Sequence, residues 1–221
     1  MSVRRLHHEQ PQSFSFTDTS MEQVRFWLGK YPQDRQRSAV IPLLWIAQKQ
    51  EGWVSEPAIR VIADMLAMPV VRVLEVATFY TMFHLHPVGR HHLQVCGTTP
   101  CMLRGAERLK EVCKRRIGPK HKPSADGMLS WEEVECLGAC VNAPVVAIDD
   151  YYHEDLTPEA LEERIEALLR GEPFEPGSAI ARFTSAPEGG PHVLLDESLY
   201  DGSLAQPLTL PDRPLPVEEK A

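Results

Sequence analysis

Four of the five cysteines fall into two short stretches, and this arrangement restricts the possible folds more than any other feature. The first stretch is CGTTPC at 96–101 and the second is CLGAC at 136–140, with 34 residues between the two pairs. No apolar run of signal-peptide length follows the N-terminus, so we expect the thiols to stay reduced. Clustered reduced thiols are more often metal ligands or redox groups than structural disulfides. We therefore expect a fold that brings two distant loops together.

Each cysteine pair begins where a predicted strand ends. Cys96 closes the strand HHLQVC, and Cys136 closes MLSWEEVEC. Because strand ends of one α/β sheet can lie side by side, the two pairs can meet at one edge, where four thiolates suit a [2Fe–2S] cluster. Backbone N–H groups in small loops can approach the cluster sulfurs and stabilise their negative charge. The loop residues expected to tune such a cluster are Gly97, Thr98, Thr99, Leu137, Gly138, Ala139 and Val141, with Leu137 and Val141 favoured as plain apolar cover.

Other chemistries also use clustered cysteines, and they stay open on spacing alone. Structural zinc sites mostly use C-x2-C pairs, and both loops here are longer. Two disulfides would need an oxidising compartment, and a thioredoxin-like dithiol would need a C-x-x-C, which is absent. The plant-type ferredoxin pattern fails at Arg104, and Rieske ligation needs a histidine in each loop, whereas His91 and His92 lie on the strand. Cys113 falls on the apolar face of a helix predicted after the first loop, so we expect a buried, inert thiol there.

The chain divides into four predicted segments, and their order indicates an α+β fold. Residues 1–18 form a loose N-terminal arm, and residues 19–89 predict a helical bundle with short loops. Residues 90–171 run strand, helix, strand, strand, helix, which indicates a small α/β domain. Residues 172–221 hold eight of the nineteen prolines. We expect them to form an extended tail that packs on other subunits.

Capping residues and prolines predict where individual elements begin. Thr19 with Glu22 predicts a capping box for the first helix, and Ser55 predicts the N-cap of the third. Pro42 predicts a late start or a kink in the second helix. Pro144 precedes a predicted strand, where either a cis or an ordinary trans peptide bond fits.

Two features have both a structural and a partner-binding interpretation. Val73, Ala77, Tyr80 and Thr81 recur at helical spacing in a predicted helix, which fits either the core of the bundle or a docking face. The basic run KRR at 114–116 predicts a solvated helix end, with contact to an acidic partner as the alternative.

Charge and motif content exclude several functions. Acidic residues outnumber basic ones by 31 to 23, which argues against nucleic acid as a partner. No stretch approaches eighteen consecutive apolar residues, so we expect no membrane span. The chain has no G-x-G-x-x-G after a strand and no Walker loop, so we expect no NADH site of its own.

Four stretches carry a resemblance to a known family: SAVIPLLWIAQKQEGWVS, VLEVATFYTMF, PVGRHHLQVCGTTPCMLRGA and CLGACVNAP. In this order they resemble the thioredoxin-like [2Fe–2S] subunit of NADH:quinone oxidoreductase, respiratory complex I, over roughly residues 15–171. The resemblance implies a helical bundle followed by a thioredoxin-like ferredoxin domain with one [2Fe–2S] cluster. The ligand positions of the family match Cys96, Cys101, Cys136 and Cys140, and Cys113 matches none.

The resemblance also implies partners and a location. In that family a flavoprotein subunit binds FMN and NADH and passes an electron to this subunit, beside the large iron–sulfur subunit of the peripheral arm. We therefore expect an electron carrier of the respiratory chain in the bacterial cytoplasm, peripheral to the inner membrane and in contact with it only through the complex. Two alternatives remain: the equivalent diaphorase subunit of an NAD-linked hydrogenase or formate dehydrogenase, and a zinc-stabilised scaffold subunit without redox function.

Overall fold

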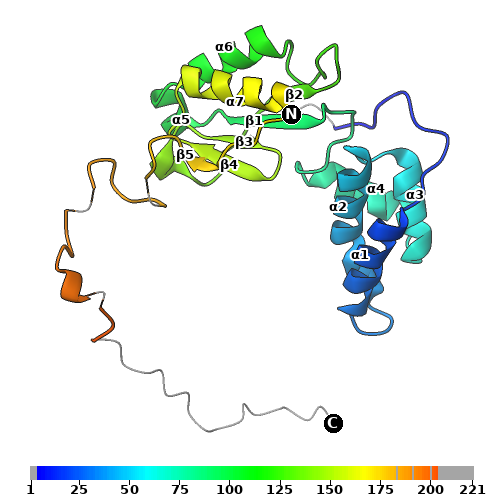
Figure 1. Ribbon diagram of the computed structural model, residues 1–221. Helices are drawn as coiled ribbons and strands as arrows, with labels where there is room; N and C mark the ends of the chain where they lie inside the picture. Colours follow the sequence, from blue (N-terminus) through cyan, green and yellow to red (C-terminus); the bar gives the residue numbers. More distant parts are fainter. Residues whose placement is uncertain (1–3, 183, 191, 200, 204–221) are drawn as a thin grey trace. The chain divides into compact units, whose positions relative to one another are not determined.

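The computed structural model describes residues 4–203 except 183, 191 and 200 (Figure 1). The chain divides into two compact units, the first ending at Ala181 and the second beginning at Arg182. Within its described residues, the second unit contains one short 3₁₀ helix, Glu197–Leu199. The part of the expected extended tail at 204–221 lies outside the described residues. All other helices and strands of the described chain lie in the first unit, and they position the cysteine loops.

Four helices and a 3₁₀ turn form the N-terminal bundle. They are α1 (Asp18–Gly29), η1 (Gln36–Ala39), α2 (Val40–Glu51), α3 (Glu56–Met65) and α4 (Val70–Phe79). These elements share one apolar core, in which Leu43, Leu44 and Ile62 have no exposed surface. Burying one such side chain stabilises the fold by about 1.5–3 kcal/mol. Val73 and Ala77 of α4 are also completely buried and belong to the core, whereas Tyr80 and Thr81, which follow α4, are exposed.

The helix starts follow local capping chemistry, with one correction. Thr17 caps α1, because its hydroxyl accepts a backbone N–H of the first turn at 3.2 Å, so the predicted cap at Thr19 is wrong. Ser55 caps α3 as predicted. Pro42 lies in the first turn of α2, where its missing N–H removes no helical hydrogen bond. The late start predicted for this helix is therefore confirmed.

The N-terminal arm packs against the bundle, unlike the loose arm expected from the sequence. The Arg4 guanidinium donates to the carbonyl oxygen of Tyr80 at 2.6 Å. The backbone N–H of His7 donates to the carbonyl of Leu85 at 2.9 Å. Both contacts reach the segment that links α4 to the sheet, so the arm supports that linker.

A mixed five-stranded sheet follows the bundle. Its strands are β1 (His91–Cys96), β2 (Leu129–Val134), β3 (Val146–Ile148), β4 (Tyr151–Glu154) and β5 (Gly177–Ser178), in the order β2-β1-β3-β4-β5. The central strand β1 is parallel to β2 and antiparallel to β3. The sequence did not predict β4 or β5, and β5 lies inside the segment expected to form an extended tail. The fold class, α+β with a mixed sheet, is as predicted.

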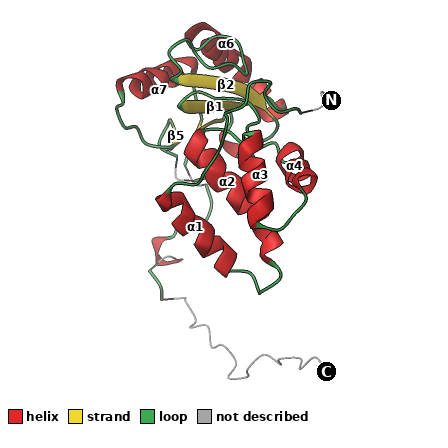
Figure 2. Ribbon diagram, turned by 90° about the vertical axis from the view of Figure 1, so that its right-hand side faces the viewer, coloured by secondary structure: helices red, strands yellow, loops and turns green. Residues whose placement is uncertain are grey.

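Two helices cover one face of this sheet. They are α6 (Ala106–Arg116) and α7 (Pro158–Arg170), which both lie on the same side of the strands in Figures 1 and 2. Successive side chains of a strand point to opposite faces. Leu93 and Val95 of β1 and Trp131 of β2 accordingly pack in the core under the helices, with no exposed surface. The residues between them point to the other face, which is polar.

The basic run at the end of α6 forms ion pairs with α7. Arg116 lies 3.0 Å from Glu166, and Arg115 pairs with Glu162. All three cations of the run are exposed in the last turn of α6, as predicted for a solvated helix end. Two of them also pair with acidic residues of α7.

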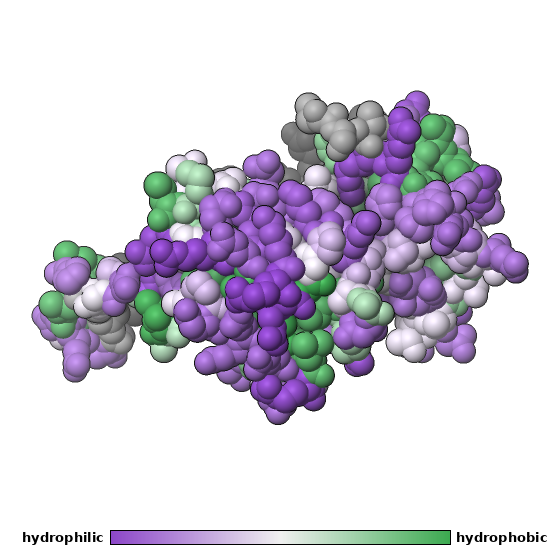
Figure 3. Space-filling model, turned by 90° about the horizontal axis from the view of Figure 1, so that it is seen from above, coloured by the Kyte–Doolittle hydropathy of each residue, from purple (hydrophilic) through white to green (hydrophobic). Residues whose placement is uncertain are grey.

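One face of the molecule shows how polar and apolar side chains are distributed on its surface. The face in Figure 3 is mostly hydrophilic, and its apolar side chains gather in small separate groups. Within the part of the chain that the structure describes, no helix combines the length and the apolar character needed to cross a membrane.

Candidate metal centre

The first cysteine loop begins at the end of the central strand. Cys96 is the last residue of β1, in register with Val134 of β2, and the next N–H, that of Gly97, donates to the Val134 carbonyl at 3.0 Å. Cys101 lies in the short helix α5 (Thr99–Leu103). The single helix predicted here is two, because Gly105 between α5 and α6 takes a φ of +105°, which favours glycine. Both thiols of this loop are buried.

The second cysteine loop follows the neighbouring strand. Cys136 comes two residues after the end of β2, and Cys140 begins the 3₁₀ turn η2 (Cys140–Asn142). Their Sγ atoms lie 3.2 Å apart, and both residues are exposed. The Tyr152 hydroxyl of β4 donates to the carbonyl of Leu137 at 2.8 Å and anchors the loop from outside.

The two loops meet at one edge of the sheet. Because β1 and β2 are parallel neighbours, their ends lie at the same edge, and each end leads into one cysteine pair. Cys96 and Cys101 share a small apolar cluster with Ala143, and Leu137 of the second loop packs against that cluster. The structure therefore brings together the four cysteines that the sequence indicated as ligands.

Hydrogen bonds reach the sulfurs of both loops. The Gly138 N–H donates to Cys136 Sγ at 3.4 Å and lowers the pKa of that thiol. Burial by itself raises the pKa of Cys96, but hydrogen bonds from the Thr98 side chain and backbone and from the Leu137 backbone outweigh it and leave the pKa below its usual value. Donors of this kind stabilise negative charge on sulfur, as expected for tuning groups.

Cys113 and Cys101 both have a raised pKa, but for different reasons. Burial in the core under α6 raises the pKa of Cys113 to about 12, and this residue lies outside the cysteine loops, as predicted for an inert thiol. Burial and a hydrogen bond with Cys96 raise the pKa of Cys101 to about 12. A coordinated metal deprotonates such a thiol outright, so the raised pKa of Cys101 does not oppose ligation.

The spacing of the sulfurs distinguishes two kinds of metal centre. A single zinc ion with Zn–S bonds of about 2.3 Å would hold its four sulfurs about 3.8 Å from one another. Among the described residues, the group whose metal-ligating atoms all lie within 4.8 Å of one another is made of two histidines and a glutamate, not of cysteines. The cysteines form two pairs instead, which fits a [2Fe–2S] cluster, where each iron takes two sulfurs.

Several residues around the loops differ from expectation or gave no signal in the sequence. Val141 is 62% exposed and does not act as apolar cover, whereas Leu137 is partly buried and does. The Ala143–Pro144 peptide bond is cis. Tyr152 was not predicted as a loop anchor, because it comes from the unpredicted strand β4.

The sequence is similar to a protein family and to individual characterised proteins. Residues 24–169 match the family model of the thioredoxin-like [2Fe-2S] ferredoxin. The chain is 51% identical over 226 residues to an E subunit of the NADH-quinone oxidoreductase of Rhizobium meliloti, covering 100% of this chain and 76% of the relative. It is also 51% identical over 158 residues to the E subunit of the NADH-quinone oxidoreductase of Rickettsia bellii, covering 71% of this chain and 95% of the relative.

A solved structure has a similar fold. The chain aligns with a chain of an NAD+-reducing [NiFe]-hydrogenase in the air-oxidized state, with a TM-score of 0.54 and 16% identity. The alignment covers 65% of this chain and 25% of that chain. At this identity the similarity is one of fold.

Proposed function

Because the chain belongs to the thioredoxin-like [2Fe–2S] ferredoxin family, we propose that it is an electron-transfer subunit of an NADH-quinone oxidoreductase, equivalent to the E subunit of its relatives. One observation carries the proposal. Two cysteine pairs, one at the end of each of two parallel neighbouring strands, meet at one sheet edge and present four thiols in two pairs.

The four loop cysteines are the proposed cluster ligands. Cys96 and Cys101 form the buried inner pair, and Cys136 and Cys140 form the exposed outer pair. A [2Fe–2S] cluster, when bound, supplies one-electron redox chemistry. The chain contributes two thiols for each iron, and it keeps water from the inner pair by burying it.

Residues around the ligands adjust the charge at sulfur and leave one side open. Thr98 and Gly138 place hydrogen-bond donors on Cys96 and Cys136, and such donors raise the reduction potential of an iron–sulfur cluster. The exposure of the outer pair leaves that side accessible for electron exchange with a partner. Met102, Leu103 and Val141, which flank ligands in the sequence, are exposed apolar side chains that a docked partner would cover.

We propose that the electron donor is the FMN of a partner flavoprotein subunit, which also binds NADH. The absence of a dinucleotide-binding motif in this sequence supports this assignment, because hydride must then be accepted elsewhere. The large iron–sulfur subunit of the peripheral arm is the proposed second neighbour. In this assembly the chain lies at the cytoplasmic face of the bacterial inner membrane and reaches the membrane only through the complex.

The two alternatives have less support. The likeness to the hydrogenase chain is one of fold, whereas two relatives that are 51% identical are NADH-quinone oxidoreductase subunits. A zinc-stabilised scaffold would need four sulfurs in one tetrahedron, which the paired arrangement of the thiols does not favour.

Iron and acid-labile sulfide analysis of the anaerobically purified full-length chain tests the cluster. We expect about two irons and two sulfides per chain, and an EPR signal of a reduced [2Fe–2S] cluster after dithionite treatment. Zinc in place of iron, with no EPR signal, would overturn the redox function.

Single cysteine variants test the ligand assignment. We expect Cys96→Ala, Cys101→Ala, Cys136→Ala and Cys140→Ala each to lose most of the iron and the EPR signal. Cys113→Ala is the matched control and should keep both, because this thiol lies in the core under α6. If Cys113→Ala lost the cluster while one of the loop variants kept it, the assignment would be wrong.

A further inference from the structure

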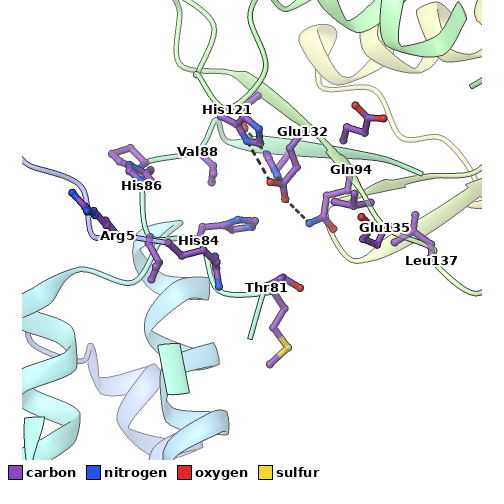
Figure 4. A pocket seen from close by; sticks show the side chains of 18 of the residues that line it. Arg5, Thr81, His84, His86, Val88, Gln94, His121, Glu132, Glu135 and Leu137 are labelled. Atoms are coloured by element: carbon purple, nitrogen blue, oxygen red, sulfur yellow. Dashed lines mark hydrogen bonds and ion pairs between the residues drawn. The ribbon is translucent and has the colours of Figure 1, made fainter. Parts of the chain in front are cut away.

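The polar face of the sheet, opposite α6 and α7, lines a cavity of about 740 Å³. Residues of β1 and β2 and of the linker between α4 and β1 line this cavity, among them His84, Gln94 and Glu132 (Figure 4). Dashed lines in Figure 4 mark the bonds that Glu132 makes there. The electron-carrying function proposed above does not use these side chains.

Three of these side chains form a group with metal-site spacing. One ligand atom each from His84, His92 and Glu132 lies within 4.8 Å of the other two. His92 Nε2 and Glu132 Oε1 are 3.2 Å apart. In a tetrahedral zinc site with bonds of about 2.0–2.1 Å, two ligand atoms lie about 3.3 Å apart. The distance between His92 Nε2 and Glu132 Oε1 therefore already matches one edge of such a tetrahedron. The ligand atom of His84 lies within 4.8 Å of both, so a modest shift of its side chain would complete the group.

Neighbouring groups hold two of the three side chains, His92 by its other ring nitrogen and Glu132 by the oxygen that faces His92. The Ser130 hydroxyl lies 2.7 Å from His92 Nδ1 and accepts the backbone N–H of Gly89 at 2.8 Å. The Gln94 amide donates to Glu132 Oε1 at 2.8 Å. Metal-ligating histidines and carboxylates are typically held by such outer partners, which fix the ring orientation and the tautomer. With Nδ1 on Ser130, His92 presents Nε2 to the group.

The third side chain, His84, is placed by its backbone. Its N–H donates to the side chain of Gln48 at 2.6 Å, and its carbonyl accepts the N–H of Val54 at 2.8 Å. Its ring stands edge-on to that of His92, with centroids 4.6 Å apart. Within residues 4–203, apart from the three undescribed positions, no hydrogen bond to the His84 ring is present, so its nitrogens are available to a ligand.

We propose that His84, His92 and Glu132 bind one divalent transition-metal ion of the Zn²⁺ class, separate from the cysteine centre. Two imidazoles and one carboxylate are a ligand set that zinc and ferrous iron use, with water in the open position. His121 Nδ1 lies 3.5 Å from the other carboxylate oxygen, Glu132 Oε2, and is not a member of the group. A bound ion would tie the linker after α4 to β1 and β2, and so join the helical bundle to the sheet.

Zinc binding to the full-length, cluster-loaded chain tests this site. The chain is freed of loosely bound metal with EDTA and dialysed against Zn²⁺, and zinc and iron are measured together by mass spectrometry. We expect about one zinc per chain with unchanged iron, and a zinc K-edge spectrum with nitrogen and oxygen neighbours at about 2.0–2.1 Å. Sulfur neighbours at about 2.3 Å would mean that zinc enters the cysteine centre, and would overturn the proposal.

Variants separate this site from general zinc binding. We expect His84→Ala and Glu132→Gln to weaken zinc binding at least about tenfold, since loss of even an outer partner has that effect. His86→Ala is the matched control, because it removes another histidine that lines the same cavity but lies outside the group. His84→Gln keeps the size of the side chain and replaces His84→Ala if the latter does not retain iron. Equal affinity of all variants and the wild type, or no zinc bound by the wild type, would refute the site.

Discussion

The junction between the linker and the sheet is expected to tolerate no side chain at Gly89. A Cβ atom added there would lie 2.3 Å from the carbonyl carbon of Leu129, 2.6 Å from its oxygen and 2.7 Å from its Cα. Ordinary contacts of a Cβ atom are 3.4–4 Å, so the two backbones would have to separate by about 1 Å. Leu129 is the first residue of β2, which is paired with β1 over six residue pairs, and it cannot move without disturbing that ladder.

The expected cost of Gly89→Ala follows from this clash. Overpacking typically costs about 1–3 kcal/mol, and the upper end applies because the neighbour is backbone rather than a flexible side chain. For a chain of this size, about 1 kcal/mol corresponds to about 2–4 °C in Tm, so we expect a fall of about 6–12 °C. The measurement is thermal unfolding of the cluster-loaded, full-length chain, followed by far-UV circular dichroism at one scan rate for all variants, because a Tm scanned with loss of a cofactor depends on the scan rate.

Gly29→Ala is the matched control for Gly89→Ala. Gly29 is the last residue of α1, and an added Cβ would meet nothing within 4 Å. Alanine in a helix is favoured over glycine by about 0.5–1 kcal/mol, so we expect an unchanged or slightly raised Tm. A Tm of Gly89→Ala within about 2 °C of the wild type would show that the strands yield at this contact, and the argument from close packing would fail.

Two further predictions concern the sheet and α7. His153 is buried and accepts a hydrogen bond from Arg164 at 3.2 Å; burial, and then the positive charge of Arg164, lower its pKa to about 4. In the unfolded state the histidine side chain takes up a proton near pH 6.5, whereas in the folded state it stays neutral down to about pH 4. The contribution of His153 to the free energy of unfolding is therefore complete above pH 6.5. It declines by roughly 1–2 kcal/mol, after allowance for solvent screening, as the pH falls toward 4. Urea unfolding at pH 7 and pH 5 should show a smaller pH effect in His153→Gln than in the wild type, and an equal effect would contradict the assignment. Thr157→Ala removes the hydroxyl that accepts the first-turn N–H of α7 at 3.2 Å and should cost about 1 kcal/mol, whereas Thr19→Ala, at the cap position that the structure does not use, should cost less than half as much.

Local sequence signals were sufficient to predict most helices and the central strands. Ser55 caps the helix that it was expected to start, and α2 starts late, with Pro42 in its first turn, as predicted. These signals act over three or four residues, so they do not depend on the rest of the fold. The prediction of Thr19 as the cap of α1 was wrong because Thr17, two residues earlier, offers the same hydroxyl acceptor.

The short strands could not be found in this way. β4 has four residues, two of them exposed tyrosines, and β5 has only two residues. Neither shows an alternating apolar pattern, and each is held by pairing with a neighbouring strand. Only the tertiary structure therefore brings residues 177–178 into the sheet.

The cysteine centre was predictable from the sequence only in part. The spacing of the cysteines, the strand before each pair and the resemblance to the ferredoxin family indicated a shared centre from the sequence, and the family match confirms the resemblance. Which donors face the sulfurs was decided by the register of β1 against β2 and by the loop conformations. Thr98 and Gly138 were expected as tuning residues, but the bond from Tyr152 to the second loop depends on a strand that the sequence did not indicate.

The amino-acid sequence by itself determined several helix starts, the two central strands and the four thiols, because each depends on residues that are near neighbours in the chain or on a specific motif. Only the tertiary structure brought together His84, His92 and Glu132, since His92 and Glu132 are 40 positions apart and form no motif. Their proximity depends on the parallel pairing of β1 with β2 and on the contact of the linker with Gln48 of α2. Strand register is set by the burial of a whole face, so polar residues on the opposite face become neighbours without any local signal of their own.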